Sequence, residues 1–188
     1  MKIGVLALQG DFMKHGKILA ELGARPVWIR YPRDLEAVEG LVLPGGESTT
    51  MSKLLTRNQL REPIHRFAAT YPVLGTCAGM ILMARRVDDP RVEPLELVDM
   101  DVTRNAYGRQ VHSFTDRLEL RNHHAGPVSG VFIRAPKIVR LGTPVQVWAV
   151  YEEAPVAVQD GRHVALSFHP ELNGELYFHQ RTFFPAHD

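Results

Sequence analysis

The sequence predicts an α/β fold with an open, mostly parallel sheet and helices on both faces. Short apolar runs alternate with segments of helical periodicity in the first half of the chain. The second half is rich in short β-type segments separated by turn residues. The length of 188 residues is most simply one domain, residues 1–188, which is large enough to bury a core. In such sheets, ligands bind at the carboxyl ends of the strands.

The elements of the first half follow from local patterns. Residues 3–8 are an unbroken apolar run, which indicates a central parallel strand. Asp11 can cap a helix that ends at Gly23 and has Phe12, His15, Ile18, Leu19 and Leu22 at helical spacing. Strands over 26–29 and 41–43 flank a short helical connection over 34–38. Ser48, Thr49 or Thr50 can cap the next helix, and a helix over 63–70, a strand over 71–74 and a buried helix over 80–84 follow.

The second half is expected to add mainly strands. Turn residues separate seven candidates, over 95–103, 117–120, 130–133, 138–141, 145–151, 156–159 and 163–167. Loops are expected over 87–94, 112–113 and 121–129, and a final helix over 175–184.

Composition excludes several classes of protein. A net charge of +1 gives no electrostatic case for binding nucleic acid or membrane, and no apolar run is long enough for a membrane span. One cysteine rules out an internal disulfide and a multi-cysteine zinc site. His123 and His124 have no partner ligands at convincing spacing, so no metal site is expected. The apolar N-terminus reads as a first strand and not as a signal peptide, so we expect a cytoplasmic protein.

The single cysteine, Cys77, stands in the small-residue stretch Gly75-Thr76-Cys77-Ala78-Gly79. An apolar strand precedes it and a buried helix follows, which predicts a thiol on a tight strand-to-helix turn. A helix N-terminus favours the thiolate, which is the nucleophilic form of cysteine. The alternative is a small buried hydrophobic residue, the common role of lone cysteines.

A candidate base and its orienting acid lie in Ser167-Phe168-His169-Pro170-Glu171-Leu172. Pro170 restricts His169 to extended geometry, and residues two apart in an extended chain point the same way. Glu171 can therefore orient the His169 ring while its other nitrogen faces a thiol, as nucleophilic catalysis requires. A polar loop is the alternative.

A third candidate site is the stretch Leu43-Pro44-Gly45-Gly46-Glu47-Ser48-Thr49-Thr50. Two glycines at a strand end leave backbone N–H groups open to an incoming oxygen, and a helix start follows. The stretch fits an anion site or an oxyanion hole, but it lacks the spacing and lysine of a P-loop. Simple turn chemistry is the alternative.

Taken together, these sites resemble class I glutamine amidotransferases, most closely the glutaminase subunits of pyridoxal 5'-phosphate synthase. Asn173, directly after the SFHPEL stretch, departs from the family pattern, in which a threonine usually stands at this position. The matching stretches are GVLALQG at 4–10, LPGGESTTM at 43–51, GTCAGM at 75–80, RNAYGRQ at 104–110, GVFIRAP at 130–136 and SFHPEL at 167–172.

The resemblance implies a flavodoxin-like three-layer sandwich and hydrolysis of L-glutamine to L-glutamate and ammonia. Cys77 would be the nucleophile, His169 the base and Glu171 its orienting acid. The N–H groups of Gly46 and Ala78 would form the oxyanion hole. Arg104 and Arg134 fit this substrate because a guanidinium is the natural partner of the glutamine α-carboxylate. The alternative for both arginines is that they are solvated surface residues. The implied glutamine contacts are Gly46, Glu47, Ser48, Arg104, Ile133 and Arg134.

The resemblance also implies a partner and no cofactor. Family members dock on a synthase subunit that receives the ammonia for vitamin B6 biosynthesis, and docking organises the oxyanion hole. Gln9 is implied as an interface residue. Two other functions remain open at this point: a stand-alone cysteine hydrolase or chaperone-like protein on the same fold, and a binding module in which Cys77 is structural. The His-Pro-Glu segment disfavours both.

Overall fold

Nine strands form one sheet in residues 1–104, 113–121 and 127–185, the part of the chain that the computed structural model describes. The strand order is β2-β1-β3-β4-β12-β11-β10-β7-β8. The first five strands of this order are parallel to their neighbours, and the other four are added antiparallel. The parallel part therefore has the 2-1-3-4-5 order of flavodoxin-like sheets, with β12 as the fifth strand.

The parallel strands are short and, except in the edge strand β2, their apolar residues are buried, as the apolar runs predict. They are β1 (Lys2–Leu6), β2 (Arg25–Ile29), β3 (Leu41–Leu43), β4 (Val73–Thr76) and β12 (His163–Leu166). The antiparallel strands are β7 (Phe114–Leu120), β8 (Val128–Phe132), β10 (Gln146–Tyr151) and β11 (Ala154–Asp160). A separate sheet in the order β5-β6-β9 contains β5 (Ala84–Val87), β6 (Val98–Thr103) and β9 (Lys137–Leu141).

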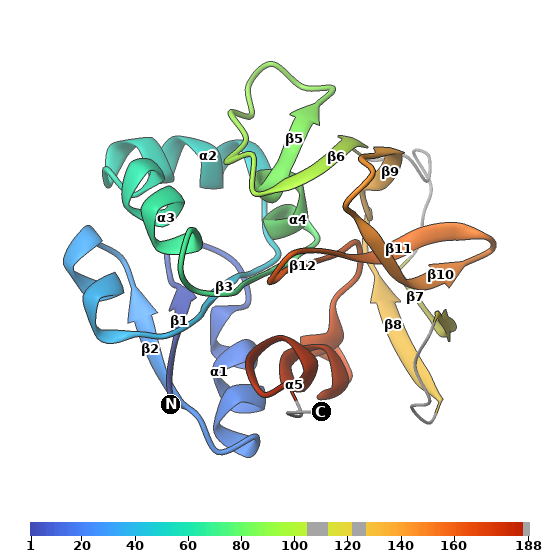
Figure 1. The fold of residues 1–188 in the computed structure, drawn as a ribbon, viewed down its shortest axis with the longest axis horizontal. Coiled ribbons are helices and arrows are strands. Elements are labelled where there is room, and N and C mark those ends of the chain that lie inside the picture. The colour runs from blue at the N-terminus through green and yellow to red at the C-terminus, as the bar shows by residue number, and fades with distance from the viewer. Residues whose placement is uncertain (105–112, 122–126, 186–188) are drawn as a thin grey trace.

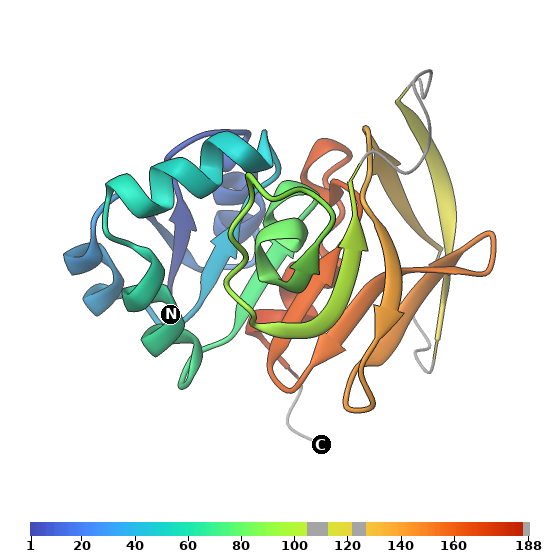
Figure 2. The ribbon, with the colours of Figure 1, turned by 90° about the horizontal axis from the view of Figure 1, so that it is seen from above.

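Helices cover both faces of the sheet (Figure 1). On one face lie α2 (Ser48–Arg57), α3 (Arg61–Ala68) and α4 (Ala78–Met83), and on the other lie α1 (Phe12–Glu21) and α5 (Tyr177–Phe183). Figure 2 shows the same layers from above, with α2 and α4 in front of the strands. Two short 3₁₀ turns complete the connections, η1 (Pro32–Ala37) and η2 (Pro170–Leu172). The predicted α/β fold with helices on both faces is confirmed.

Side chains point alternately to the two faces of the sheet along each strand, so the molecule has two hydrophobic cores, one on each face. In β3, Leu41 and Leu43 face the cluster under α2, α3 and α4, whereas Val42 belongs to the cluster under α1 and α5. Since successive strand residues point to opposite faces, one apolar strand serves both layers.

The structure corrects three local predictions. The cap of α2 is Glu47, not Ser48, Thr49 or Thr50, and its carboxylate accepts the backbone N–H groups of Thr49 (3.1 Å) and Thr50 (2.7 Å). A carboxylate reaches the same orphan donors that a hydroxyl would, and its charge also favours the helix N-terminus.

The other two corrections concern α1 and β5. Asp11 precedes α1, but its side chain makes no capping hydrogen bond. Residues 84–87 form a strand because they pair with β6, so the helix ends at Met83 and the loop expected over 87–94 begins after Val87. The residues 112 and 122–126 of two other expected loops lie outside the described part, as do His123 and His124.

The closest approach between α4 and β3 gives a stability prediction. A Cβ atom added at Gly79 would overlap the backbone carbonyl of Leu43, which cannot rotate away. We expect Gly79→Ala to destabilise by roughly 3 kcal/mol or more, because this overlap outweighs the gain of about 1 kcal/mol in helix propensity. Urea unfolding followed by circular dichroism measures the change.

Gly174→Ala is the matched control for this prediction. Gly174 has a φ of +71°, and nothing lies within 4 Å of an added Cβ. Its cost should therefore be only that of backbone strain, about 1 kcal/mol. Equal losses in the two variants would contradict the proposed steric origin.

Candidate active site

Four strand ends of the parallel sheet converge on one cavity of about 450 Å³. Its wall includes Gln9 after β1, the glycine pair after β3, Cys77 after β4 and His169 after β12. This is the carboxyl edge of the sheet, where α/β proteins bind their ligands. Of the predicted site residues, the cavity is lined by Gln9, Gly46, Glu47, Ser48, Cys77, Arg104, Ile133, Arg134 and His169.

Cys77 occupies a strained turn between β4 and α4. Its φ of 48° lies in the left-handed region, which is unfavourable for a residue with a side chain. The Cys77 N–H donates to the Leu166 carbonyl at 2.8 Å, and this bond ties the turn to the end of β12. The side chain is 7% exposed, with Sγ 3.8 Å from the Ile133 carbonyl oxygen. The turn thus presents a nearly buried thiol to the cavity, as the strand-turn-helix pattern predicts.

His169 is bound to Glu171 through its Nδ1 atom. The distance from Nδ1 to Glu171 Oε1 is 2.6 Å, and the His169 N–H donates to the Val131 carbonyl at 2.8 Å. Burial by itself would lower the pKa of His169, but hydrogen bonds to Cys77 and Glu171, and the charges of both, raise it to about 10. The arrangement therefore favours the imidazolium form of His169.

The geometry of this segment differs from the extended chain that the sequence predicted. Pro170 begins the 3₁₀ turn η2 instead of continuing a strand. Proline suits the first position of a helical turn because it has no N–H to satisfy there. The turn brings Glu171 under the His169 ring, so the contact is made by a different backbone path. Glu171 lies below the cavity and is 5% exposed.

Gly45 is required beside His169. A Cβ atom at this position would overlap the His169 ring. A Cβ atom at Gly10 would overlap the Gly45 carbonyl in the same way, so the loops after β1 and β3 touch through their backbones. The Gln9 side chain strengthens this contact, since its Oε1 accepts the Glu47 N–H at 3.0 Å.

The mouth of the cavity is ionic. Burial would raise the pKa of Glu47, but hydrogen bonds from Thr49 and Thr50 lower it to about 2. Arg104 contacts Glu47 Oε1 through Nη2 at 3.3 Å and pairs with Asp89 through Nη1. Hydrogen bonds from Arg91 hold the pKa of Asp89 well below its usual range, with Arg104 adding to the effect.

The remaining predicted residues lie around the thiol. Ala78 is the first residue of α4, so its N–H has no acceptor within the helix. Ser48 is 2% exposed, and its hydroxyl has no hydrogen-bond partner among the described residues. Arg134 has a φ of 45° and follows Ile133 on the cavity wall.

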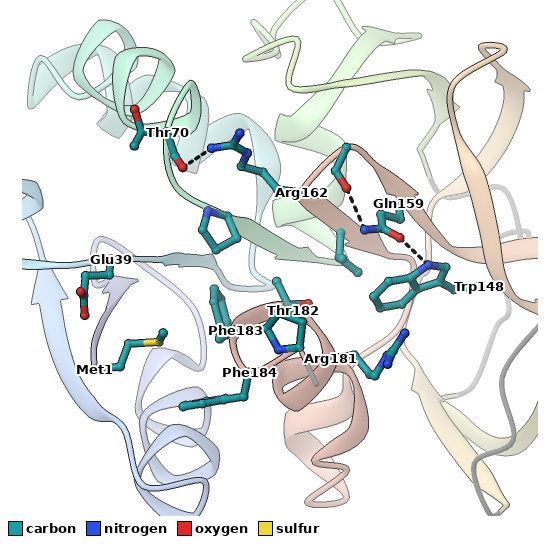
Figure 3. A pocket seen from close by; sticks show the side chains of 14 residues that line it. Met1, Glu39, Thr70, Trp148, Gln159, Arg162, Arg181, Thr182, Phe183 and Phe184 are labelled. Carbon is teal, nitrogen blue, oxygen red and sulfur yellow. Dashed lines mark hydrogen bonds between the residues drawn. The ribbon is translucent and has the colours of Figure 1, made fainter. Parts of the chain in front are cut away.

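A second cavity, of about 750 Å³, lies at the opposite edge of the sheet (Figure 3). Met1, Pro72 and Arg162 line it at the amino ends of β1, β4 and β12. Figure 3 shows Trp148 donating to Gln159, at 2.8 Å, on its wall. This cavity contains none of the predicted site residues. In the described part of the chain, no three metal-ligating side chains cluster, and no helix is long and apolar enough to cross a membrane.

Comparison with known proteins identifies the family. The model of the SNO glutamine amidotransferase family matches residues 5–184. The chain belongs to this family. It is 48% identical over 183 residues to "Pyridoxal 5'-phosphate synthase subunit PdxT" of Solibacter usitatus (strain Ellin6076), with 95% of each chain covered. A protein of the same name from Frankia casuarinae is 49% identical over 185 residues, covering 95% of this chain and 92% of that one.

A solved structure supports the same identification. The crystal structure of a glutamine amidotransferase superposes with a TM-score of 0.90 at 40% identity, covering 96% of each chain. The family match and the fold shared with a solved glutamine amidotransferase together confirm the resemblance indicated by the motifs.

Sequence reasoning missed His15, which lies beneath Glu171. His15 is fully buried, with Nε2 3.5 Å from Glu171 Oε2. The pattern placed it on the inward face of α1 among apolar residues, which was correct. The available signal was a histidine at an inward position of α1, the helix that follows the carboxyl end of β1. Such a position lies near the candidate site, because the site is at the carboxyl edge of the sheet.

The contact between His169 and Glu171 gives a pKa prediction. Glu171→Gln removes the negative charge under the ring, so we expect the pKa of His169 to fall by one unit or more. NMR titration of the His169 ring proton measures it. The ring signals of His65, exposed on α3, should be the same in both proteins. An unchanged His169 titration would contradict the role assigned to the carboxylate.

Proposed function

We propose that this chain is the glutaminase subunit of a pyridoxal 5'-phosphate synthase, which hydrolyses L-glutamine to L-glutamate and ammonia for a synthase partner. The names of the PdxT relatives support the assignment, at 44–49% identity over nearly the whole chain. The observation that carries it is Cys77 on a strained turn beside the His169–Glu171 pair. A thiol, a base and an orienting acid form the general arrangement for attack on an amide.

The proposed first stage forms a thioester. The Cys77 thiolate attacks the side-chain amide carbon of glutamine, and the carbonyl oxygen becomes an oxyanion. The N–H groups of Gly46 and Ala78 stabilise that oxyanion. The His169 imidazolium then gives its Nε2 proton to the amide nitrogen, the C–N bond breaks, and ammonia leaves. Glu171 keeps the ring oriented through Nδ1.

The second stage returns the enzyme to its starting state. His169, now neutral, takes a proton from water as that water attacks the γ-glutamyl thioester. The C–S bond breaks, glutamate is released, and the thiolate and imidazolium are restored. One glutamine and one water thus yield one glutamate and one ammonia.

Substrate recognition is assigned to the ionic mouth of the cavity. The α-carboxylate of glutamine pairs with Arg104 and Arg134, because guanidinium groups bind carboxylates with two parallel hydrogen bonds. Arg104 is oriented by Asp89 and Glu47, which supports this role. The α-amino group faces Glu47 and Ser48, and Ile133 contributes its backbone beside the thiol.

The partner is assigned to the side of the cavity that contains Gln9. The Gln9 side chain holds the Glu47 N–H, next to the proposed oxyanion-hole residue Gly46. A synthase subunit that moves Gln9 would therefore move the peptide that stabilises the transition state. This coupling gives a physical route for activation by docking.

Replacement of the nucleophile tests the activity. We expect Cys77→Ala to lower ammonia release from L-glutamine by at least about 10³-fold in the presence of the synthase subunit. The fold should persist, because the side chain is small and its neighbours on the turn are unchanged. A glutamate dehydrogenase-coupled assay measures ammonia, and near-ultraviolet circular dichroism checks the fold. Retained ammonia release would refute the mechanism, and wild-type activity that the partner leaves unchanged would favour a stand-alone hydrolase.

Replacement of the carboxylate-binding arginine tests substrate recognition. Arg104→Lys keeps the charge but loses the two-pronged geometry, so we expect KM for glutamine to rise about tenfold with little change in kcat. Arg91→Lys is the matched control, because Arg91 also pairs with Asp89 but does not line the cavity. Equal KM changes in both variants would show that Asp89 alone matters and that Arg104 does not contact glutamine.

A further inference from the structure

Two histidines lie buried beneath the proposed triad and have no part in the mechanism above. His15 comes from α1 and His179 from α5, and both are 0% exposed. His15 Nδ1 lies 2.9 Å from His179 Nε2. On its other side, His15 Nε2 lies 3.5 Å from Glu171 Oε2 and 3.3 Å from Thr76 Oγ1. A continuous line of polar groups thus runs from the helix layer to the His169–Glu171 pair.

Both rings are neutral in this environment. Burial lowers the pKa of His15 well below its usual value, with smaller contributions from His179 and His169. Burial also lowers the pKa of His179 to about 3. A neutral imidazole has one N–H group and one lone pair, so each ring donates from one nitrogen and accepts at the other.

The position of Glu171 decides the direction of the hydrogen bonds. A carboxylate only accepts, and the Thr76 hydroxyl can accept as well as donate, so a proton on His15 Nε2 suits both groups that face this nitrogen. His15 Nδ1 then has the lone pair and accepts the Nε2–H of His179. In this arrangement the proton of His179 is on Nε2, so its Nδ1 atom is an acceptor and has no N–H group that needs a partner. That atom does lack a partner among the described residues, and a buried orphan acceptor costs less than a buried orphan N–H.

We propose that His15 is a positioning residue for the glutaminase reaction, donating from Nε2 to Glu171 while His179 fixes the tautomer of His15. The proposal rests on the function proposed above. Its consequence is a directed chain in which each group donates to the next, from His179 to His15 to Glu171. Glu171 in turn accepts from His169, which faces the thiol.

The burial of Glu171 shows why such a donor is needed. Its side chain is 0% exposed, so water does not satisfy the carboxylate. Oε1 accepts from His169, whereas Oε2 has no hydrogen-bond partner among the described residues and is approached by His15 Nε2 at 3.5 Å. A buried carboxylate oxygen without a donor is costly, and it would weaken the anion that holds the His169 imidazolium.

The titratable groups around His15 come from several of the elements packed against it. His179 faces His15 from α5, Glu171 faces it from η2, and His169 lies beyond Glu171 at the end of β12. Thr76 of β4 is the remaining polar contact of His15 and does not titrate in the ordinary range. Cys77 follows Thr76 in the sequence, and its thiol is the group on which the proposed network acts.

Two amide variants of His15 test the proposal with matched chemistry. In His15→Gln, the amide nitrogen takes the place of the imidazole Nε2 and can donate to Glu171. In His15→Asn, the shorter amide reaches only the place of Nδ1, next to His179, and Glu171 loses its donor. Leu19→Ala is the packing control, because Leu19 is fully buried one turn farther along α1.

The main readout is the reactivity of Cys77 itself. Cys77 is the only cysteine, so iodoacetamide incorporation followed by mass spectrometry reports one thiol. The rate is measured against pH on the whole chain without glutamine. In parallel, kcat and KM for ammonia release are measured with the synthase subunit. Alkylation needs no turnover, so a failure of the proposed function and a failure of this inference give different results.

For His15→Asn, we expect the alkylation inflection to move up by about one pH unit and kcat to fall about 10- to 100-fold, with KM within about twofold. His15→Gln should remain within about threefold of wild type in kcat, and Leu19→Ala should keep the wild-type inflection while melting earlier. An unshifted inflection in His15→Asn, or equal losses in the Gln and Asn variants, would overturn the proposal. If the wild type releases no ammonia, the proposed function fails and the alkylation result still decides whether His15 acts on the thiol.

Discussion

The need to satisfy one buried carboxylate organises the site and much of the fold around it. Glu171 has no exposed side-chain surface, and its Oε1 lies 2.6 Å from His169 Nδ1. The 3₁₀ turn η2 places Glu171 under the ring, and α1 brings His15 to its far side. Helix α5 then contributes His179 behind His15. Residues from α1, α5 and η2, which come from both ends of the chain, thus meet around one buried carboxylate.

The sheet provides the precision that this arrangement requires. The proposed nucleophile and base follow neighbouring parallel strands, β4 and β12, and a hydrogen bond from the Cys77 N–H to the Leu166 carbonyl locks the two ends in register. Glycine then lets the loops after β1 and β3 meet at backbone distance and lets the His169 ring pack against Gly45, since side chains at Gly10 and Gly45 would overlap these neighbours. Rigid strands fix the spacing, and the missing side chains leave room for the His169 ring.

The sequence predicts the parallel strands and the nucleophile turn well, because apolar runs and small-residue turns are local signals. Residues 41–43 form the predicted strand without change, and Cys77 lies on the predicted turn. The sequence predicts less where distant segments decide. Strand β5 exists because β6 pairs with it, and Glu47 caps α2 in place of the expected Ser48, Thr49 or Thr50 because its carboxylate reaches two backbone N–H groups. His15 and His179 are 164 positions apart, so only the fold brings them together.

The site divides into an ionic mouth and a neutral floor, and this division has a thermodynamic consequence. At the mouth, Arg104, Glu47 and Asp89 are partly solvated, so their pairing adds little to stability but orients the Arg104 guanidinium. Below it, burial keeps His15 and His179 uncharged, so of the three histidines that lie near Glu171 in the described part of the chain, His169 is the one that carries the charge. The folded pKa of His169, about 10, lies above the unfolded value of 6.5. Its charge therefore stabilises the fold fully below pH 6.5, and that contribution is lost as pH rises through 10. The proposed pairing of His169 with Glu171 is thus also a stabilising interaction at neutral pH.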